Sequence, residues 1–168
     1  ENHLISTAQI IEELDSEGEC YIDRENGIMY IYTELAPEEI SIDMSVANFD
    51  LISANGISYV TFDGFDITET RNIGIAVRAS NYCTITNCRA SLTYMAAVVL
   101  DGYNNTLTNN LVTNTAYNAV CFSGGDQITL TPGNGIMKNN VIRYTGEVIR
   151  SYASGLDISG VGLTVSNN

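Results

Sequence analysis

From residue 57 onward the chain consists of short alternating apolar and polar runs that repeat. Five copies of a seven-residue segment can be aligned, and the fourth position is apolar in every copy while the sixth is Asn in four of five. The sixth position recurs at offsets of 23, 22, 30 and 28 residues. A repeat of this length built from short strands predicts a solenoid of stacked coils. The copies span 59–65, 82–88, 104–110, 134–140 and 162–168.

A second register lies between these copies, in triplets whose outer members are always apolar. Their middle members vary, as Ala76, Val99, Cys121 and Asp157. Because strand side chains alternate between two faces, the constant members should face inward and the variable ones outward. The Asn column suits a turn, since Asn tolerates the left-handed conformation and its amide can bond to the Asn one coil away. The triplets span 75–77, 98–100, 120–122 and 156–158.

These patterns predict an all-β fold, a right-handed parallel β-helix over residues 57–168. A terminal coil exposes a strand edge. We therefore expect the β-helix to be part of a longer solenoid, or its exposed coil end to pair with a further domain or another chain.

Residues 1–56 have a different texture and are predicted to form a separate small region that precedes the coils. Apolar residues near helical spacing predict a short helix over 4–14. Asn26-Gly27 stands between two strand-like runs within 20–32, which predicts a β-hairpin closed by a type I′ turn. Two further strands are expected, at 38–45 and 49–53.

The net charge of the chain limits the classes of partner that it can bind. Seven Lys and Arg face twenty Asp and Glu, a formal net charge of −13, which disfavours nucleic acid because phosphates need clustered cations. No apolar run approaches the ~18 residues of a membrane span, so no membrane partner is expected. A signal sequence could precede residue 1, and an extracellular or cell-surface location is favoured.

The cysteines are predicted to be structural. Cys20, Cys83, Cys88 and Cys121 are accompanied by the single His3, and their spacing completes no tetrahedral zinc site and no thiol–imidazole pair. Their strand-like flanks are typical of buried cysteines. We therefore predict no metal and no cofactor, with Ca²⁺ as the remaining alternative because the chain is rich in carboxylates.

At this point a resemblance appears, carried by residues 17–32, 57–65, 124–134 and 159–162. The chain resembles bacterial right-handed parallel β-helix repeat proteins related to polysaccharide-degrading glycoside hydrolases, including xylanase and fucosidase members. The resemblance implies a polysaccharide or oligosaccharide as partner. Gln127 departs from it, since such proteins often carry Arg there, and the same architecture also serves lyases, esterases and spacers.

The two longest offsets locate insertions at 126–133 and 145–154, and loops that project together from a rigid stack often form binding sites. Glycoside hydrolysis needs two carboxyl groups, ~5 Å apart for retention and ~6.5 to 9.5 Å for inversion. Asp126 and Asp157 belong to neighbouring coils, about 5 Å apart along the stack, and are the predicted catalytic acid–base pair. The predicted substrate-binding residues are Asp101, Glu147, Arg150 and Tyr152.

Plainer interpretations stand beside each residue. Asp126 could equally cap its own turn, Asp101-Gly102 suits turn chemistry, and the loop residues Glu147, Arg150 and Tyr152 suit a solvated surface. The leading hypothesis is part of a glycoside hydrolase. The alternatives are a noncatalytic carbohydrate-binding or surface-display module, and a Ca²⁺-dependent polysaccharide lyase.

Overall fold

The computed structural model describes residues 6–7 and 10–168, which separate into two units, 1–43 and 44–168. The sequence pattern placed the boundary later, at 56/57. The difference arises because residues 44–56 already contribute to the first coil. Strand β4 (Ile52–Asn55), for example, pairs with strand β7 (Ile75–Asn81) of the next coil.

The described part of the first unit contains a small sheet in the order β1-β2-β3, in which β1 is parallel to β2 and β2 is antiparallel to β3. The predicted hairpin is therefore confirmed. Two short 3-10 helices complete the unit, η1 and η2. The bounds are β1 (Ser6–Thr7), η1 (Ile11–Glu13), β2 (Glu19–Asp23), β3 (Ile28–Ile31) and η2 (Pro37–Glu39).

The hairpin turn differs from the predicted type I′ turn. Asp23 pairs with Ile28, so the turn has four residues, 24–27, and only Gly27 among them has positive φ. The Asp23 carboxylate accepts the N–H groups of Glu25 and Asn26, at 3.0 and 3.1 Å. A carboxylate that caps the turn in this way removes the need for two left-handed residues.

Two other predictions for this region are wrong. The described part of segment 4–14 holds one 3-10 turn and no α-helix, while residues 4–5 and 8–9 lie outside the described residues. No strand forms over 38–45, and of 49–53 only the end enters β4. The apolar residues of 42–49 alternate but remain exposed, so their pattern has no partner strand to bury it.

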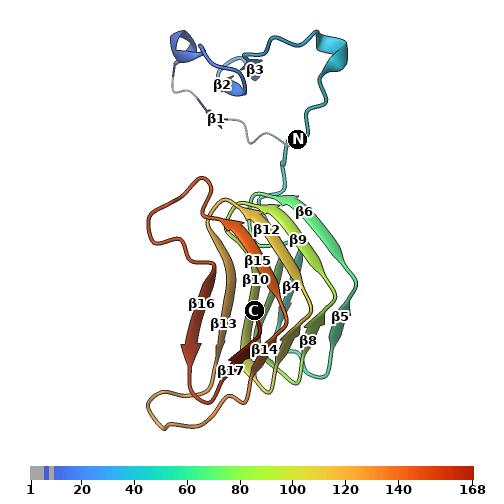
Figure 1. The fold of residues 1–168 in the computed structure, drawn as a ribbon, viewed down its shortest axis with the longest axis vertical. Coiled ribbons are helices and arrows are strands. Elements are labelled where there is room, and N and C mark those ends of the chain that lie inside the picture. Colours follow the sequence, from blue (N-terminus) through green and yellow to red (C-terminus); the bar gives the residue numbers. More distant parts are fainter. Residues whose placement is uncertain (1–5, 8–9) are drawn as a thin grey trace. The chain divides into compact units, whose positions relative to one another are not determined.

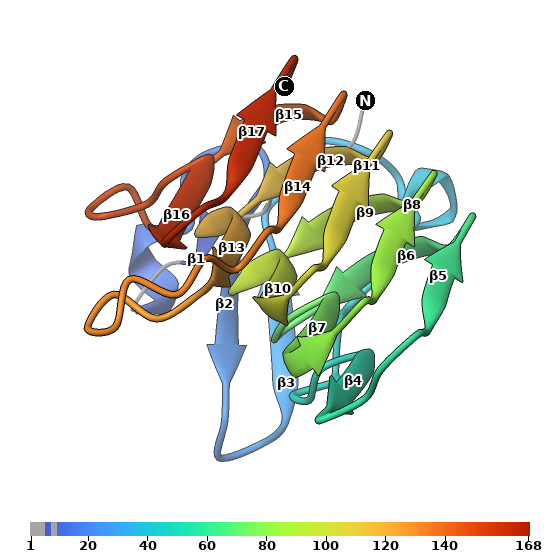
Figure 2. The same cartoon turned by 90° about the horizontal axis from the view of Figure 1, so that it is seen from below.

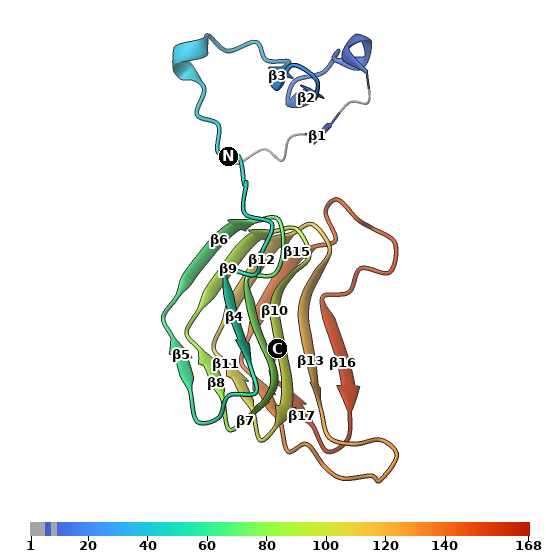
Figure 3. The ribbon, with the colours of Figure 1, turned by 180° about the vertical axis from the view of Figure 1, so that it is seen from behind.

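The second unit is a right-handed parallel β-helix, as predicted. Each coil runs through sheet 1, sheet 2 and sheet 3 in turn, and every strand pairs in parallel with the equivalent strand of the next coil (Figures 1 and 2). The repeat indicated at least two strands per coil, and the strands of sheet 3 are the third. Figure 3 shows the same stacking from behind.

The strands of the β-helix have the following bounds. Sheet 1 consists of β4 (Ile52–Asn55), β7 (Ile75–Asn81), β10 (Ala96–Tyr103), β13 (Asn118–Gly124) and β16 (Leu156–Gly160). Sheet 2 consists of β5 (Thr61–Asp63), β8 (Thr84–Thr86), β11 (Thr106–Thr108), β14 (Ile136–Lys138) and β17 (Thr164–Ser166). Sheet 3 consists of β6 (Asp66–Thr70), β9 (Arg89–Thr93), β12 (Leu111–Thr115) and β15 (Val141–Thr145).

Both predicted registers are confirmed, and they supply the core. The fourth-position residues pair from coil to coil along sheet 2, and the outer members of the triplets pair along sheet 1. In the middle coils these side chains are almost fully buried, and each such burial contributes roughly 1.5–3 kcal/mol. The largest of them are Phe122, Ile75, Ile85, Leu100, Leu107 and Met137.

The corner between sheets 2 and 3, here called corner 2–3, has the same two-residue form in each coil. The predicted Asn column provides the first residue, and all its members have left-handed φ. In the last three coils the next residue is also Asn, and these residues form a ladder: the Asn110 amide donates to Asn140 at 2.9 Å, and the Asn140 amide donates to Asn168 at 2.8 Å. In the predicted column the Asn139 amide donates to Asn109 over a longer distance, 3.4 Å, and this bond is exposed to solvent. The main ladder thus lies one residue later than predicted.

Cys83 and Cys88 occupy inward positions equivalent to those of the ladder. The Cys88 N–H donates to the Asn110 side chain at 2.9 Å, and the Cys88 thiol donates to the Thr86 carbonyl at 3.2 Å. Asn110 makes the same bond to the carbonyl two residues before it, in Thr108, at 2.9 Å. These cysteines replace Asn within the stack and, like the other two, form no disulfide, which agrees with a structural role.

Candidate functional site

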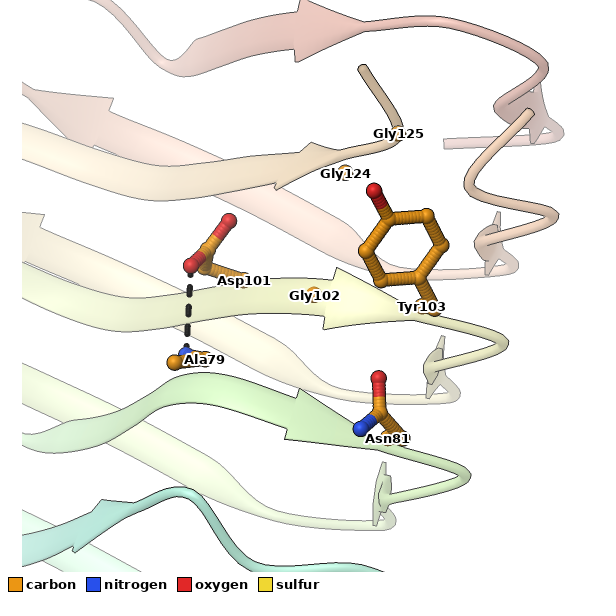
Figure 4. Close-up of a pocket in the computed structure, with 7 residues that line it drawn as sticks. All are labelled: Ala79, Asn81, Asp101, Gly102, Tyr103, Gly124 and Gly125. Carbon is orange, nitrogen blue, oxygen red and sulfur yellow. Dashed lines mark hydrogen bonds between the residues drawn. The ribbon is translucent and has the colours of Figure 1, made fainter. Parts of the chain in front are cut away.

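A depression of about 310 Å³ opens on the outer face of sheet 1, beside the corner between sheets 1 and 2, here called corner 1–2. Figure 4 shows its lining, which comes from β7, β10 and β13 and the residue that follows β13. The site is therefore built by three successive coils of the rigid stack. Its lining residues are Ala79, Asn81, Asp101, Gly102, Tyr103, Gly124 and Gly125.

Glycines form the floor of the depression because the coils approach one another here too closely for side chains. A Cβ on Gly102 would lie 1.9 Å from the Ser80 carbonyl oxygen, and one on Gly124 would lie 2.2 Å from the Gly102 carbonyl oxygen. Both contacts are to backbone, which cannot move aside. Gly125 follows with φ +82°. The floor is consequently bare main chain, open to close approach by a ligand.

Asp101 is held in place from both neighbouring coils. Its Oδ2 accepts the N–H of Ala79 at 3.2 Å, and its Oδ1 accepts the hydroxyl of Ser123 at 2.9 Å. The Ala79 N–H is available because Ala79 has left-handed φ (+47°) and the register between β7 and β10 shifts between Leu100 and Gly102. Such a bulge re-aims backbone groups. The carboxylate is half-buried and oriented, with lone pairs left for a ligand.

Tyr103 and Asn81 complete the site. They pair across adjacent coils, and Tyr103 shares the outer face with Asp101 because the two are separated by two residues along the strand. In Figure 4 the Tyr103 hydroxyl points toward Gly124 and Gly125, and the Asn81 amide lies one coil below. An aromatic ring, a carboxylate and an amide thus surround a floor without side chains.

The structure does not bring the predicted catalytic pair together. Asp157 pairs with Cys121, the central residue of β13, whereas Asp126 lies two residues beyond the end of β13, so the two carboxylates occupy different positions along the strand direction. Asp126 Oδ1 accepts the N–H groups of Ile128 and Thr129 at 2.8 and 3.2 Å. These hydrogen bonds hold the pKa of Asp126 below its usual value, whereas a catalytic acid needs a raised pKa.

The other predicted binding residues also separate. Glu147, Arg150 and Tyr152 lie in the loop between β15 and β16, where Glu147 accepts the Asn114 amide at 3.3 Å and Tyr152 is 97% exposed. This loop leaves one end of sheet 1 and the loop of Asp126 leaves the other, so the two insertions do not project together (Figure 1). Of the predicted site residues, only Asp101 lines the depression.

Sequence reasoning missed Tyr103 and Asn81. One signal was available: Gly102, Gly124 and Gly160 each lie three residues after a member of the outward column, and stacked glycines indicate close backbone approach. The bulge at Ala79 had no signal, since alanine does not favour left-handed φ.

The fold and this site define a parallel β-helix protein with an open depression on the outer face of sheet 1. Residues 2–167 match the family described as "Periplasmic copper-binding protein (NosD)", and the chain belongs to this family. No curated protein and no solved structure matches the chain. The family description agrees with the predicted secretion of the chain, although it names the periplasm and not the cell surface. It gives no support to the predicted relation to glycoside hydrolases.

The family description corrects the prediction that the protein takes no cofactor, because it names copper. Copper prefers imidazole, thiolate and thioether ligands. Among the described residues, however, no three His, Cys, Asp or Glu side chains gather into a metal site. Burial, and then the charge of Asp157, raise the pKa of Cys121, which disfavours the ligating thiolate. His3 lies outside the described residues, and the described side chains do not fit a copper centre.

The membrane prediction was that no segment crosses a bilayer. Within residues 6–7 and 10–168, no helix has the length and apolarity that a crossing requires.

Proposed function

We propose that this chain is a secreted β-helix domain that binds carbohydrate without cleaving it, at the depression around Asp101. The observation that carries the proposal is the convergence of Asp101, Tyr103 and Asn81 over the glycine floor. A sugar ring presents apolar C–H faces and hydroxyl groups. Tyrosine stacks against the former, while carboxylate and amide groups bond to the latter.

Pre-organisation supports binding at this place. Asp101 is already fixed by hydrogen bonds from Ala79 and Ser123, so ligand binding costs little further side-chain entropy at this residue. The bare backbone of Gly102 and Gly124 allows a sugar to approach closely. The acidic surface of the chain, with net charge −13, keeps such a module soluble.

The arrangement of carboxylates favours binding over hydrolysis. Among the described residues that line the depression, Asp101 alone carries a carboxyl group, whereas glycoside hydrolysis requires two. In the other candidate pair, Asp157 is level with the middle of β13, whereas Asp126 lies in the loop beyond the end of that strand. Hydrolysis is therefore the second candidate function and depends on a carboxyl group beyond this depression.

The test is retention of the whole chain on insoluble polysaccharides together with an assay of reducing ends. We expect retention without release of reducing ends. Asp101→Ala should weaken binding about tenfold or more, since a hydrogen bond to a charged group is worth ~1.5–3 kcal/mol. Tyr103→Leu should weaken it up to about tenfold, since aromatic stacking is worth ~0.5–1.5 kcal/mol. Asp66→Asn, an exposed carboxylate on sheet 3, is the matched control and should bind as the wild type does.

Two results would contradict the proposal. The first is unchanged retention in both Tyr103→Leu and Asp101→Ala. The second is release of reducing ends that stops in Asp157→Asn, which would replace binding by hydrolysis.

A further inference from the structure

Two tyrosines form an exposed aromatic surface beside the depression. The rings of Tyr59 and Tyr82 stack with centroids 4.8 Å apart and planes inclined by 4°, and they are 77% and 50% exposed. Tyr82 directly follows Asn81 of the depression, and its N–H donates to the Tyr103 carbonyl at 3.0 Å. The tyrosine pair therefore lies next to the proposed site: Tyr82 is on the first of its three coils, and Tyr59 is on the coil before.

The backbone makes these tyrosines costly. Tyr59 and Tyr82 have φ of 61° and 55°, and the corresponding corner residues of the following coils are Asn104 and Asn134, with φ of 58° and 52°. Asn accepts the left-handed conformation readily, whereas for other side chains it costs roughly 1–2 kcal/mol. The exposed rings recover little of this through burial. Stacking recovers about 0.5–1.5 kcal/mol, so stability alone does not account for tyrosine at this corner.

The geometry of the pair leaves aromatic surface open. The rings are nearly parallel with centroids 4.8 Å apart, and both side chains remain largely accessible to solvent, so aromatic surface is left open to a ligand. The pair, Tyr103 and the glycine floor follow one another on four successive coils, a distance of about 14 Å along the stack. A single sugar cannot reach across this distance, but a chain of several sugars can.

Charge limits which chains can bind. Among the described lining residues Asp101 carries the only charge, and the nearby guanidinium of Arg78 is already paired with Asp50 at 2.9 Å. A uronate would bring a second carboxylate beside Asp101 with no cation to neutralise it, and unpaired like charges oppose binding.

We infer that the site takes a neutral glycan chain laid across successive coils, with the Tyr59–Tyr82 pair as a second subsite. This inference rests on the proposed function, and it adds the ligand class and the direction of the chain. The depression holds one end of the glycan, and the tyrosine pair stacks against sugars farther along it.

The experiment is calorimetry on the whole chain with disaccharides and hexasaccharides of neutral gluco-, xylo- and manno-glycans, and with hexagalacturonate. We expect at least one neutral hexasaccharide to bind about tenfold tighter than its disaccharide, and hexagalacturonate to bind at least tenfold more weakly than that hexasaccharide. The double variant Tyr59→Asn/Tyr82→Asn should lose this chain-length gain and keep the disaccharide affinity. It places at both positions the residue that Asn104 and Asn134 already provide at this corner.

Tyr144→Asn is the matched control. Tyr144 is 61% exposed with φ +55°, and it lies in the column of sheet 3 in which Asn114 already occurs. It should leave all affinities unchanged. Equal affinity for disaccharide and hexasaccharide, full hexasaccharide affinity in the double variant, or tight binding of hexagalacturonate would overturn the inference while disaccharide binding upheld the proposed function. If no sugar binds, both fall together.

Discussion

Two corners of the β-helix have the same backbone form but different side chains. In its last three coils, corner 2–3 places a left-handed Asn and then a ladder Asn, and one coil earlier Cys88 takes the ladder position. Corner 1–2 also begins with a left-handed residue, yet that residue changes from Tyr82 to Asn104 between adjacent coils. Its inward residue changes from Cys83 to Asn105 and then to Gly135, against which the Phe122 ring packs.

Stacking alone explains corner 2–3, because each amide there bonds to the coils above and below it. It does not explain corner 1–2, where the tyrosine pair, the depression and the insertion of residues 126–133 all occur. The difference teaches that, in a solenoid, the place where a column stops repeating is the place to look for function. Three further changes test this contrast.

The largest expected effect is that of Gly102→Ala beside corner 1–2. Its Cβ would lie 1.9 Å from the Ser80 carbonyl oxygen, and we expect a loss of at least about 3 kcal/mol in the free energy of unfolding, measured by urea denaturation. Gly64→Ala at corner 2–3 is the control, since its Cβ would meet nothing within 4 Å and only the left-handed backbone costs about 1 kcal/mol. Equal losses would remove the steric explanation of the glycine floor.

The next effect compares the two adjacent Asn columns of corner 2–3. Asn140→Ala removes the hydrogen bonds of this side chain to the Asn110 amide and to the Leu107 and Lys138 carbonyls, and should cost about 3 kcal/mol. Asn139→Ala changes only the exposed, left-handed residue and should cost about 1 kcal/mol. The two midpoints of denaturation decide the matter, and a smaller loss for Asn140→Ala would show that the inner ladder does not carry this corner.

The smallest effect concerns the insertion at corner 1–2. The pKa of Asp126 is lowered in the fold by the N–H groups of Ile128 and Thr129. Its stabilising contribution is therefore present above the unfolded-state pKa of about 3.9 and is lost as the pH falls through the lower folded value. Asp126→Asn should therefore lower stability near neutrality, where the ionised carboxylate contributes, and should make stability fall less steeply as the pH drops through this acidic range. A wild-type Asp126 resonance that titrates above pH 4 by carboxyl NMR would contradict this.

Much of the fold followed from the repeat, because a one-residue slip would move every inward side chain to the surface. The columns through Ile85 and Val98 therefore fixed the registers of sheets 2 and 1. The sequence prediction placed the Asn ladder one residue too early. In the later coils two consecutive residues at this corner are Asn, and the pattern does not show which of them points inward. Sheet 3 was missed because its inward column includes the small Ala90 and starts directly after the corner.

The site was harder to predict than the fold. The repeat gave the separation of Asp126 and Asp157 along the stack but not the corner from which each insertion leaves, and that corner sets their lateral distance. The position of Asp101 depends on the bulge at Ala79, which arises from coil-to-coil pairing and not from the preference of any residue.

The buried Asn ladder also determines how the β-helix should come apart. Asn110 and Asn140 each bond to an Asn side chain of the next coil. Detaching that coil exposes the amide to solvent and weakens the hydrogen bonding that holds the remaining coil. Under mechanical load, the β-helix should consequently unfold one coil at a time from its end, because each detached coil weakens the attachment of the next.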